Sequence, residues 1–319
     1  MVYPSAPMVV ECSSMDERST ESRRQMLGTA SAFSAFLLWG LLPFYWKWLG
    51  AVSAPEILAH RIVWSSLLLA IIVPISQRRE LSEAIRDRRA LLIAAGAGVV
   101  IGINWFIYTW AVGAERLVEA SLGYYINPLV SVFLGVVVLR ERLTPAQLVA
   151  LLLAAAGVLV LAVSYGRIPW VSLGLAFSFG FYGLVKKVGR LNSVMSLFVE
   201  LSVLAPIALV HLLARHDAGT GAFGAAGPRI TWLLAGTGIV TIIPLLLFGA
   251  GARRIPLSRV GFLQYVAPTL MLLIGTLFYG EPFTPVHIAS FALIWSALAI
   301  YTTTLVPRRR RPCDARAAT

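Results

Sequence analysis

Ten long apolar segments constrain this chain more than any other feature. Their approximate ranges are 27–47, 54–76, 90–112, 117–139, 144–164, 169–185, 193–213, 230–251, 257–279 and 284–305. A helix needs about 20 apolar residues to cross a bilayer, and lipid offers no partner to a free backbone N–H or C=O group. The sequence therefore predicts an all-α integral membrane protein with ten transmembrane helices.

Composition agrees with this class. The chain of 319 residues is 58% hydrophobic and only 13% charged, whereas a soluble domain carries about 25% charged residues. Residues 1–26 are polar and lack the apolar core of a signal peptide, so we expect a mostly disordered tail and an uncleaved first span. Cys12 and Cys313 lie in the two tails, without the spacing of a disulfide framework or a metal site. We expect no metal and no cofactor.

The basic residues predict the orientation of the chain. Most of its 27 lysines and arginines fall in the two tails and in the even-to-odd connections between segments, including Lys186 and Lys187 in the sixth-to-seventh connection. This asymmetry follows the positive-inside rule and places both termini in the cytoplasm. We interpret the Arg308–Arg311 run as a contact with anionic lipid and expect no nucleic-acid partner.

The two halves of the chain carry the same pattern at a constant offset of 140 residues. The stretch "GYYINPLVSVFLGVVVLRERLTP" (123–145) matches "LQYVAPTLMLLIGTLFYGEPFTP" (263–285). Among the matched pairs are Tyr125 and Tyr265, Pro128 and Pro268, Gly135 and Gly275, Glu141 and Glu281, Gly40 and Gly180, and Gly98 and Gly238. We predict a duplicated unit, with copies at 27–165 and 166–305 and a basic cytoplasmic tail at 306–319.

Each copy holds five segments, and an odd number inserts the second copy upside down relative to the first. Inverted repeats of this kind, with a site near the midplane, are typical of secondary transporters. Prolines within spans loosen the backbone, which is tolerated where it faces protein or a water-filled cavity. We predict helix kinks at Pro43, Pro128, Pro244 and Pro268.

Polar residues recur at helical spacing on one face of the third, fourth and ninth segments. Helix packing explains the glycines on these faces, whereas the larger polar groups favour a common central cavity. Contacts between helices remain the alternative for both. The residues predicted to bind substrate are Trp39, Asn104, Trp105, Tyr108, Tyr124, Asn127, Tyr182, Gln264 and Tyr265.

Several ionisable residues fall inside or near the segments. His60 and Arg61 lie about 10 Å into the second segment, and Arg61 has Glu119 or Glu56 as a possible ion-pair partner. Glu200 has no basic residue one turn away in its own segment, and the offset pairs it with His60. Such groups are structural ion pairs, or they bind substrate or carry protons; a lone buried carboxylate favours its neutral form.

These residues resemble the EamA family of the drug/metabolite transporter superfamily. The resemblance rests on the two matched stretches and covers roughly residues 27–305. "EILAHRIVWS" (56–65), "GINWFIYTWAV" (102–112), "EASLGYYINPL" (119–129) and "LGLAFSFGFYGLVKK" (173–187) further resemble its RarD subfamily. The resemblance implies two inverted five-helix EamA repeats, a bacterial inner-membrane location and transport of small organic molecules. It supplies no catalytic residues.

The sequence therefore predicts a permease or exporter that works by alternating access with a proton as a candidate coupling ion. Its expected partners are a small organic substrate, membrane lipid and, as an open alternative, further copies of the chain. No nucleophile elbow, P-loop or metal cluster is present, so we expect no enzymatic activity. A lipid-modifying enzyme using His60 and Glu119, and a sensor without transport, are the alternatives.

Overall fold

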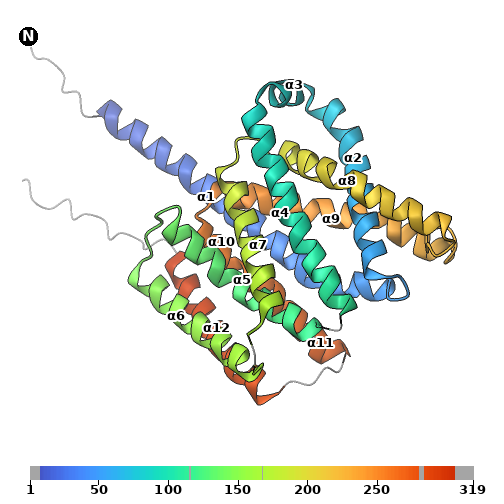
Figure 1. Ribbon diagram of the computed structural model, residues 1–319. Coiled ribbons are helices and arrows are strands. Elements are labelled where there is room, and N and C mark those ends of the chain that lie inside the picture. Colours follow the sequence, from blue (N-terminus) through green and yellow to red (C-terminus); the bar gives the residue numbers. More distant parts are fainter. Residues whose placement is uncertain (1–7, 115, 167, 280–283, 306–319) are drawn as a thin grey trace, which may run out of the picture. The chain divides into compact units, whose positions relative to one another are not determined.

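A computed structural model of the protein describes residues 8–114, 116–166, 168–279 and 284–305, and twelve helices lie within them (Figure 1). The helices are α1 (Met8–Trp48), α2 (Ala54–Ser76), α3 (Arg78–Arg86), α4 (Arg88–Gly113), α5 (Leu117–Val137), α6 (Pro145–Ser164), α7 (Trp170–Val188), α8 (Ser193–Asp217), α9 (Pro228–Arg254), α10 (Leu257–Gln264), α11 (Val266–Tyr279) and α12 (Pro285–Leu305).

Ten membrane-crossing helices within the described ranges confirm the predicted fold class. The ten candidate spans match the ten apolar segments, with α10 and α11 together forming the span Leu257–Tyr279. Helix α3 is the exception because it is short and rich in charge, and it connects α2 to α4. The helix starts follow local capping chemistry: Thr144 and Gln147 form a capping box at α6, and Asn192 accepts from the Met195 amide at α8.

Two compact units make up the chain. The larger contains α1 to α5 and α7 to α11, within residues 1–141 and 168–282. The smaller contains α6 and α12, which pack side by side (Figure 1). Within this pair Ser290 Oγ donates to the Gly157 carbonyl at 2.6 Å, and a Cβ at Gly157 would lie 2.8 Å from the Ser290 carbonyl oxygen. Gly157 thus lets the two helices approach closely.

The helix contacts in the larger unit reflect the duplication. Helix α1 packs on α9 and α11, and its counterpart α7 packs on α4 and α5, which are the counterparts of α9 and α11. The α2–α8 contact maps onto itself when the copies are exchanged. This pairing is what a two-fold relation between the copies produces, and five spans per copy make the relation an inversion.

Glycines of the first and sixth spans meet neighbouring helices. A Cβ at Gly40 would lie 2.8 Å from the Leu270 side chain, and one at Gly180 would lie 2.7 Å from the Val130 side chain. The 140-residue offset carries the first contact onto the second. Small residues at such positions allow the close backbone approach on which membrane helix packing depends.

Helix ends differ from the sequence-based expectation in two places. Helix α1 begins at Met8, so the expectation of a mostly disordered tail is wrong for that part of it. Pro43, Pro128 and Pro244 lie within continuous helices, whereas the ninth span is interrupted at Tyr265, three residues before Pro268. Helix α10 ends at Gln264, and Pro268, four residues later, has no N–H to donate to the Gln264 carbonyl. Bends at the first three prolines stay a prediction.

Candidate functional site

The polar and aromatic residues of the larger unit form two groups along the helices. We call the end where α1 ends and α2 begins the outer end, after the predicted orientation, and the opposite end the inner end. The Arg61 cluster, in the outer half, consists of Arg61, Thr241, Trp46, Trp105, Tyr108 and Tyr124. The Glu200 cluster, in the inner half, consists of Glu200, Lys186, Tyr182 and Ser196.

Arg61 is the centre of the first cluster. Its Nε donates a hydrogen bond of 3.0 Å to Thr241 Oγ1 of α9. Its guanidinium carbon lies 5.0 Å from the ring centroid of Trp46 and 5.1 Å from that of Trp105, within cation–π distance. Helices α1, α2, α4 and α9 therefore converge on one positive charge.

The predicted ion pairs of Arg61 do not form. Glu56 Oε2 instead lies 3.2 Å from Arg215 Nη2, and Glu119 Oε2 lies 3.9 Å from Arg116 Nη1. Both carboxylates also accept backbone amide hydrogen bonds, Glu119 from Val171 at 2.7 Å. The expectation failed because each carboxylate lies beside an arginine and a free helix or loop amide that only the folded chain brings near.

Two tyrosines complete the outer cluster. The rings of Tyr108 (α4) and Tyr124 (α5) pack edge to face with centroids 6.2 Å apart. Both tyrosines lie in the neighbourhood of Arg61. Arg61, Trp105 and the two tyrosines all remain partly exposed. The cluster thus combines one positive charge, two hydroxyls and a partly exposed aromatic surface.

Asn104 uses its amide for helix packing. Its Nδ2 donates to the Leu175 carbonyl and to Ser178 Oγ of α7, both at 2.9 Å. This contact matches the alternative in which polar groups join helices. A role for Asn104 in substrate binding stays a prediction.

Three further predicted residues lie on α5 and the broken ninth span. Asn127, Gln264 and Tyr265 are buried, and Asn127 Oδ1, Gln264 Oε1 and the Tyr265 hydroxyl have no hydrogen-bond partner among the described residues. Such orphaned polar atoms are uncommon in folded proteins. They leave hydrogen-bonding capacity near the break in the ninth span, which keeps these residues as candidates for substrate binding.

Trp39 and Tyr182, the latter also part of the Glu200 cluster, belong to a group of aromatic rings. Trp39 lies 5.6 Å from Phe248, and Tyr182 stacks on the same ring at 5.7 Å. Phe179 contacts all three rings. These residues therefore fill the core between α1, α7 and α9, apart from the Arg61 cluster.

Glu200 is paired, which corrects the expectation of an isolated carboxylate. Lys186 Nζ lies 2.7 Å from Glu200 Oε1, and both side chains are almost completely buried. The Tyr182 hydroxyl donates to Glu200 Oε2 at 2.9 Å, and Ser196 Oγ donates to Oε1 at 2.5 Å. Lys186 lies within α7 and not in the connection to which the basic pattern assigned it.

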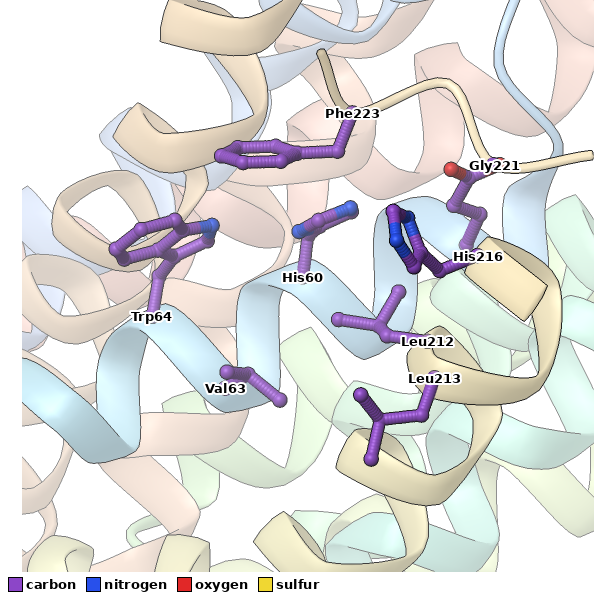
Figure 2. Close-up of a pocket in the computed structure, with 9 residues that line it drawn as sticks. His60, Val63, Trp64, Leu212, Leu213, His216, Gly221 and Phe223 are labelled. Carbon is purple, nitrogen blue, oxygen red and sulfur yellow. The ribbon is translucent and has the colours of Figure 1, made fainter. Parts of the chain in front are cut away.

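His60 faces a cavity of about 230 Å³ at the outer end of α2 and α8 (Figure 2). Its ring stacks on Phe223 with centroids 5.1 Å apart, and Glu56 and His216 line the same cavity. Neither ring nitrogen of His60 has a hydrogen-bond partner in the described structure. A dyad of His60 with Glu119, as a lipid-modifying enzyme would need, therefore does not form.

The two copies are in direct contact towards the inner end. Helix α5 packs along α10, whereas α5 and α11 have no contact of similar extent within the described residues. Glu141, at the inner end of α5, accepts hydrogen bonds from the amides of Leu257 at 2.6 Å and Ser258 at 2.8 Å. The carboxylate thereby caps α10, at the helix end where the dipole favours negative charge.

Sequence reasoning missed four residues of these clusters, which are Thr241, Trp46, Lys186 and Ser196. Thr241 is one hydroxyl within an apolar run, and Trp46 lies at the end of the first segment. Lys186 was masked by the basic residues that follow it. The available signal was the short connection between α7 and α8, across which the long Lys186 side chain reaches Glu200 although the two helices have no extensive contact among the described residues.

Ten helices in two matched copies, with charged and polar side chains buried between them, define a membrane permease with an internal inverted repeat. The model of the EamA-like transporter family matches residues 26–163 and 168–303. The protein belongs to this family.

Named relatives agree with that assignment. The chain is 45% identical over 296 residues to "Uncharacterized transporter YojE" of Bacillus subtilis (strain 168), covering 91% of this chain and 97% of the relative. It is 39% identical over 292 residues to "Protein RarD" of Escherichia coli (strain K12), covering 91% and 99%. A solved crystal structure with 23% identity has a TM-score of 0.67 over 87% of this chain and 98% of its own, which supports the fold.

Proposed function

We propose that the protein is a secondary transporter that moves small organic molecules across the bacterial inner membrane by alternating access. The observation that carries this proposal is the unequal contact between the two copies, in which α5 packs along α10 at the inner end but has no similar contact with α11. In an inverted repeat, exchanging the conformations of the copies closes the outer end and opens the inner end. The described conformation is then the outward-facing one.

The proposed substrate site lies in the outer half and includes the Arg61 cluster. Its aromatic rings and few polar groups have the composition of small-molecule sites. Asn127, Gln264 and Tyr265 are proposed to orient the substrate as it passes the break in the ninth span. Trp39 and Tyr182 are proposed to contact it once the inner half opens.

We further propose that His60 couples transport to the proton gradient. Histidine titrates close to physiological pH, and both nitrogens of His60 are free to take part in proton transfer. Glu56 from α2 and His216 from α8 line the same cavity, and Arg215 holds the Glu56 carboxylate. Glu200 is not part of this proposal because Lys186 pairs with it.

Release from proteoliposomes tests the transport function. Vesicles are loaded with a defined mixture of small organic acids, amides and amines, and mass spectrometry measures which compounds leave faster with protein than without it. We expect selective, protein-dependent release of at least one compound. Equal release of every compound from protein-containing and protein-free vesicles contradicts the proposal.

The coupling part of the proposal has a separate control. An imposed pH gradient is expected to accelerate release in wild type and not in His60→Gln. His287→Gln on α12 removes another histidine and is expected to respond as wild type does. A gradient response in His60→Gln equal to that of wild type rules out His60 as the proton carrier.

A further inference from the structure

Arg61 is a charge inside a membrane span without a compensating charge among the described residues. Its one hydrogen bond to a described residue, from Nε, goes to the neutral hydroxyl of Thr241. A charged side chain at such a depth is costly and is usually paired or part of a substrate pathway. The unmatched charge of Arg61 therefore calls for an anionic partner.

The Arg61 guanidinium has unused hydrogen-bond donors for that partner. Arginine has five N–H donors in a planar fork, and the terminal nitrogens of Arg61 make no hydrogen bond to any described residue. The contacts with Trp46 and Trp105 stabilise the positive charge but occupy no N–H group. Four donors thus stay free on a side chain that keeps partial exposure.

The remaining members of the cluster limit the kind of anion. Tyr108 and Tyr124 supply hydroxyls and ring surface beside Arg61, which suits an apolar or aromatic body. One guanidinium neutralises one negative charge, so a dianionic phosphate would keep an uncompensated charge in a poorly solvated site. A carboxylate matches the arginine fork with two parallel hydrogen bonds.

We propose that Arg61 binds the carboxylate of a monoanionic substrate whose aromatic or apolar body packs against Trp46, Trp105, Tyr108 and Tyr124. This inference rests on the proposed transport function and specifies its substrate class. Thr241 holds the Arg61 side chain in place through Nε and leaves the terminal nitrogens for the ligand. A cationic substrate of the same size is repelled by the same charge.

Equilibrium binding to the full-length protein in nanodiscs tests the inference without requiring transport. The probes are indole-3-acetate, its neutral amide indole-3-acetamide and the cation tryptamine, which share one ring system. Isothermal titration calorimetry measures each dissociation constant. We expect wild type to bind the carboxylate about 10- to 100-fold more tightly than the amide, because hydrogen bonds to a charged group are lost with the amide, and to bind tryptamine least.

Variants test whether the preference for the carboxylate depends on the Arg61 side chain. Arg61→Gln is expected to remove the preference for the carboxylate, and Arg61→Lys to retain part of it, because lysine keeps the charge but not the fork. Lys47→Gln is the matched control: it also removes one outer-end positive charge in contact with a ring, that of Tyr279. It is expected to bind all three probes as wild type does.

Three results overturn the inference: equal affinity of wild type for the carboxylate and the amide, wild-type binding of the carboxylate by Arg61→Gln, or no saturable binding of the carboxylate. None of them contradicts the transport function, which the release assay measures over acids, amides and amines alike. Conversely, carboxylate binding at Arg61 without any protein-dependent release contradicts transport and leaves the anion site in place.

Discussion

The duplication relates each helix crossing in one copy to an equivalent crossing in the other. In one such pair of crossings the contacts are the same in both copies, whereas in a second pair they differ. Gly40 on Leu270 and Gly180 on Val130 are the same contact in the two copies, related by the 140-residue offset. These crossings join α1 to α11 and α7 to α5. Their agreement indicates that this packing is common to both copies.

In the second pair of crossings, the contact in one copy is shifted along the helix relative to the contact in the other. A Cβ at Gly98 would lie 2.7 Å from the Glu200 carbonyl oxygen, and the offset maps this contact onto Gly238 and His60. Gly238 instead meets Trp64, 2.9 Å from its carbonyl carbon. Trp64 follows His60 by roughly one helical turn, so α4 on α8 and α9 on α2 pack in different registers.

The difference locates the proposed motion. Under the proposed alternating access, crossings that are equal in both copies can persist unchanged. Crossings that differ are the ones that must change when the two copies exchange their conformations. Interfaces of packed helices have discrete arrangements and do not deform continuously. We infer that α4 and α9 slide on α8 and α2 when the closed end changes from inner to outer.

The largest expected effect is a loss of stability when the buried Lys186–Glu200 pair of the inner half is broken. Glu200→Leu leaves Lys186 charged and buried, and removing one partner of a buried ion pair costs about 3–5 kcal/mol. The free energy of unfolding in a denaturant titration measures the loss. The double variant Lys186→Met/Glu200→Leu is expected to recover more than half of it. A single variant as stable as wild type contradicts the stabilising role of the pair.

A smaller effect is expected at the shifted crossing. Gly98→Ala places a methyl group against the Glu200 backbone, and overpacking of this kind costs about 1–3 kcal/mol. Gly96 is the matched control on the same helix, because a Cβ there meets no atom within 4 Å. Gly96→Ala is expected to be neutral or slightly stabilising. Equal loss of stability in both variants contradicts close packing at Gly98.

The smallest expected effect concerns the cap at the inner end. Glu141→Gln keeps one oxygen acceptor for Leu257 or Ser258 but loses the charge and the second acceptor. Caps are worth about 1 kcal/mol, and we expect a loss of that size in the same titration. Thr144→Ala, which removes the α6 cap in the smaller unit, is the comparison for an ordinary N-cap. A change in Glu141→Gln larger than that in Glu200→Leu reverses the proposed order.

The spans, their number and the duplication were predictable because they depend on local hydropathy and on a repeat in the sequence itself. The glycine contacts followed from residue size. The ion-pair partners did not, since Lys186 and Glu200 meet through the turn between α7 and α8, and Arg61 finds Thr241 across α2 and α9. Side-chain partners between helices depend on rotation and register, which a periodic apolar pattern does not specify.

The break in the ninth span illustrates the same limit. Pro128 and Pro268 occupy equivalent positions, yet α5 is continuous and the ninth span is interrupted at Tyr265. Proline predicts a weak point in both helices. Which of them breaks depends on the neighbouring contacts, and these differ between the copies.

Amide hydrogen exchange in nanodiscs tests most directly the claim that the inner half, where the Glu200 cluster lies, is held closed while the outer half stays accessible. Wild type, Glu200→Gln and Arg61→Gln are compared by mass spectrometry of peptides from both halves. The account predicts that Glu200→Gln accelerates exchange about tenfold or more in the inner parts of α7, α8 and α10, and that Arg61→Gln leaves those peptides unchanged. Unchanged inner-half exchange in Glu200→Gln, or equal acceleration at both ends, contradicts it.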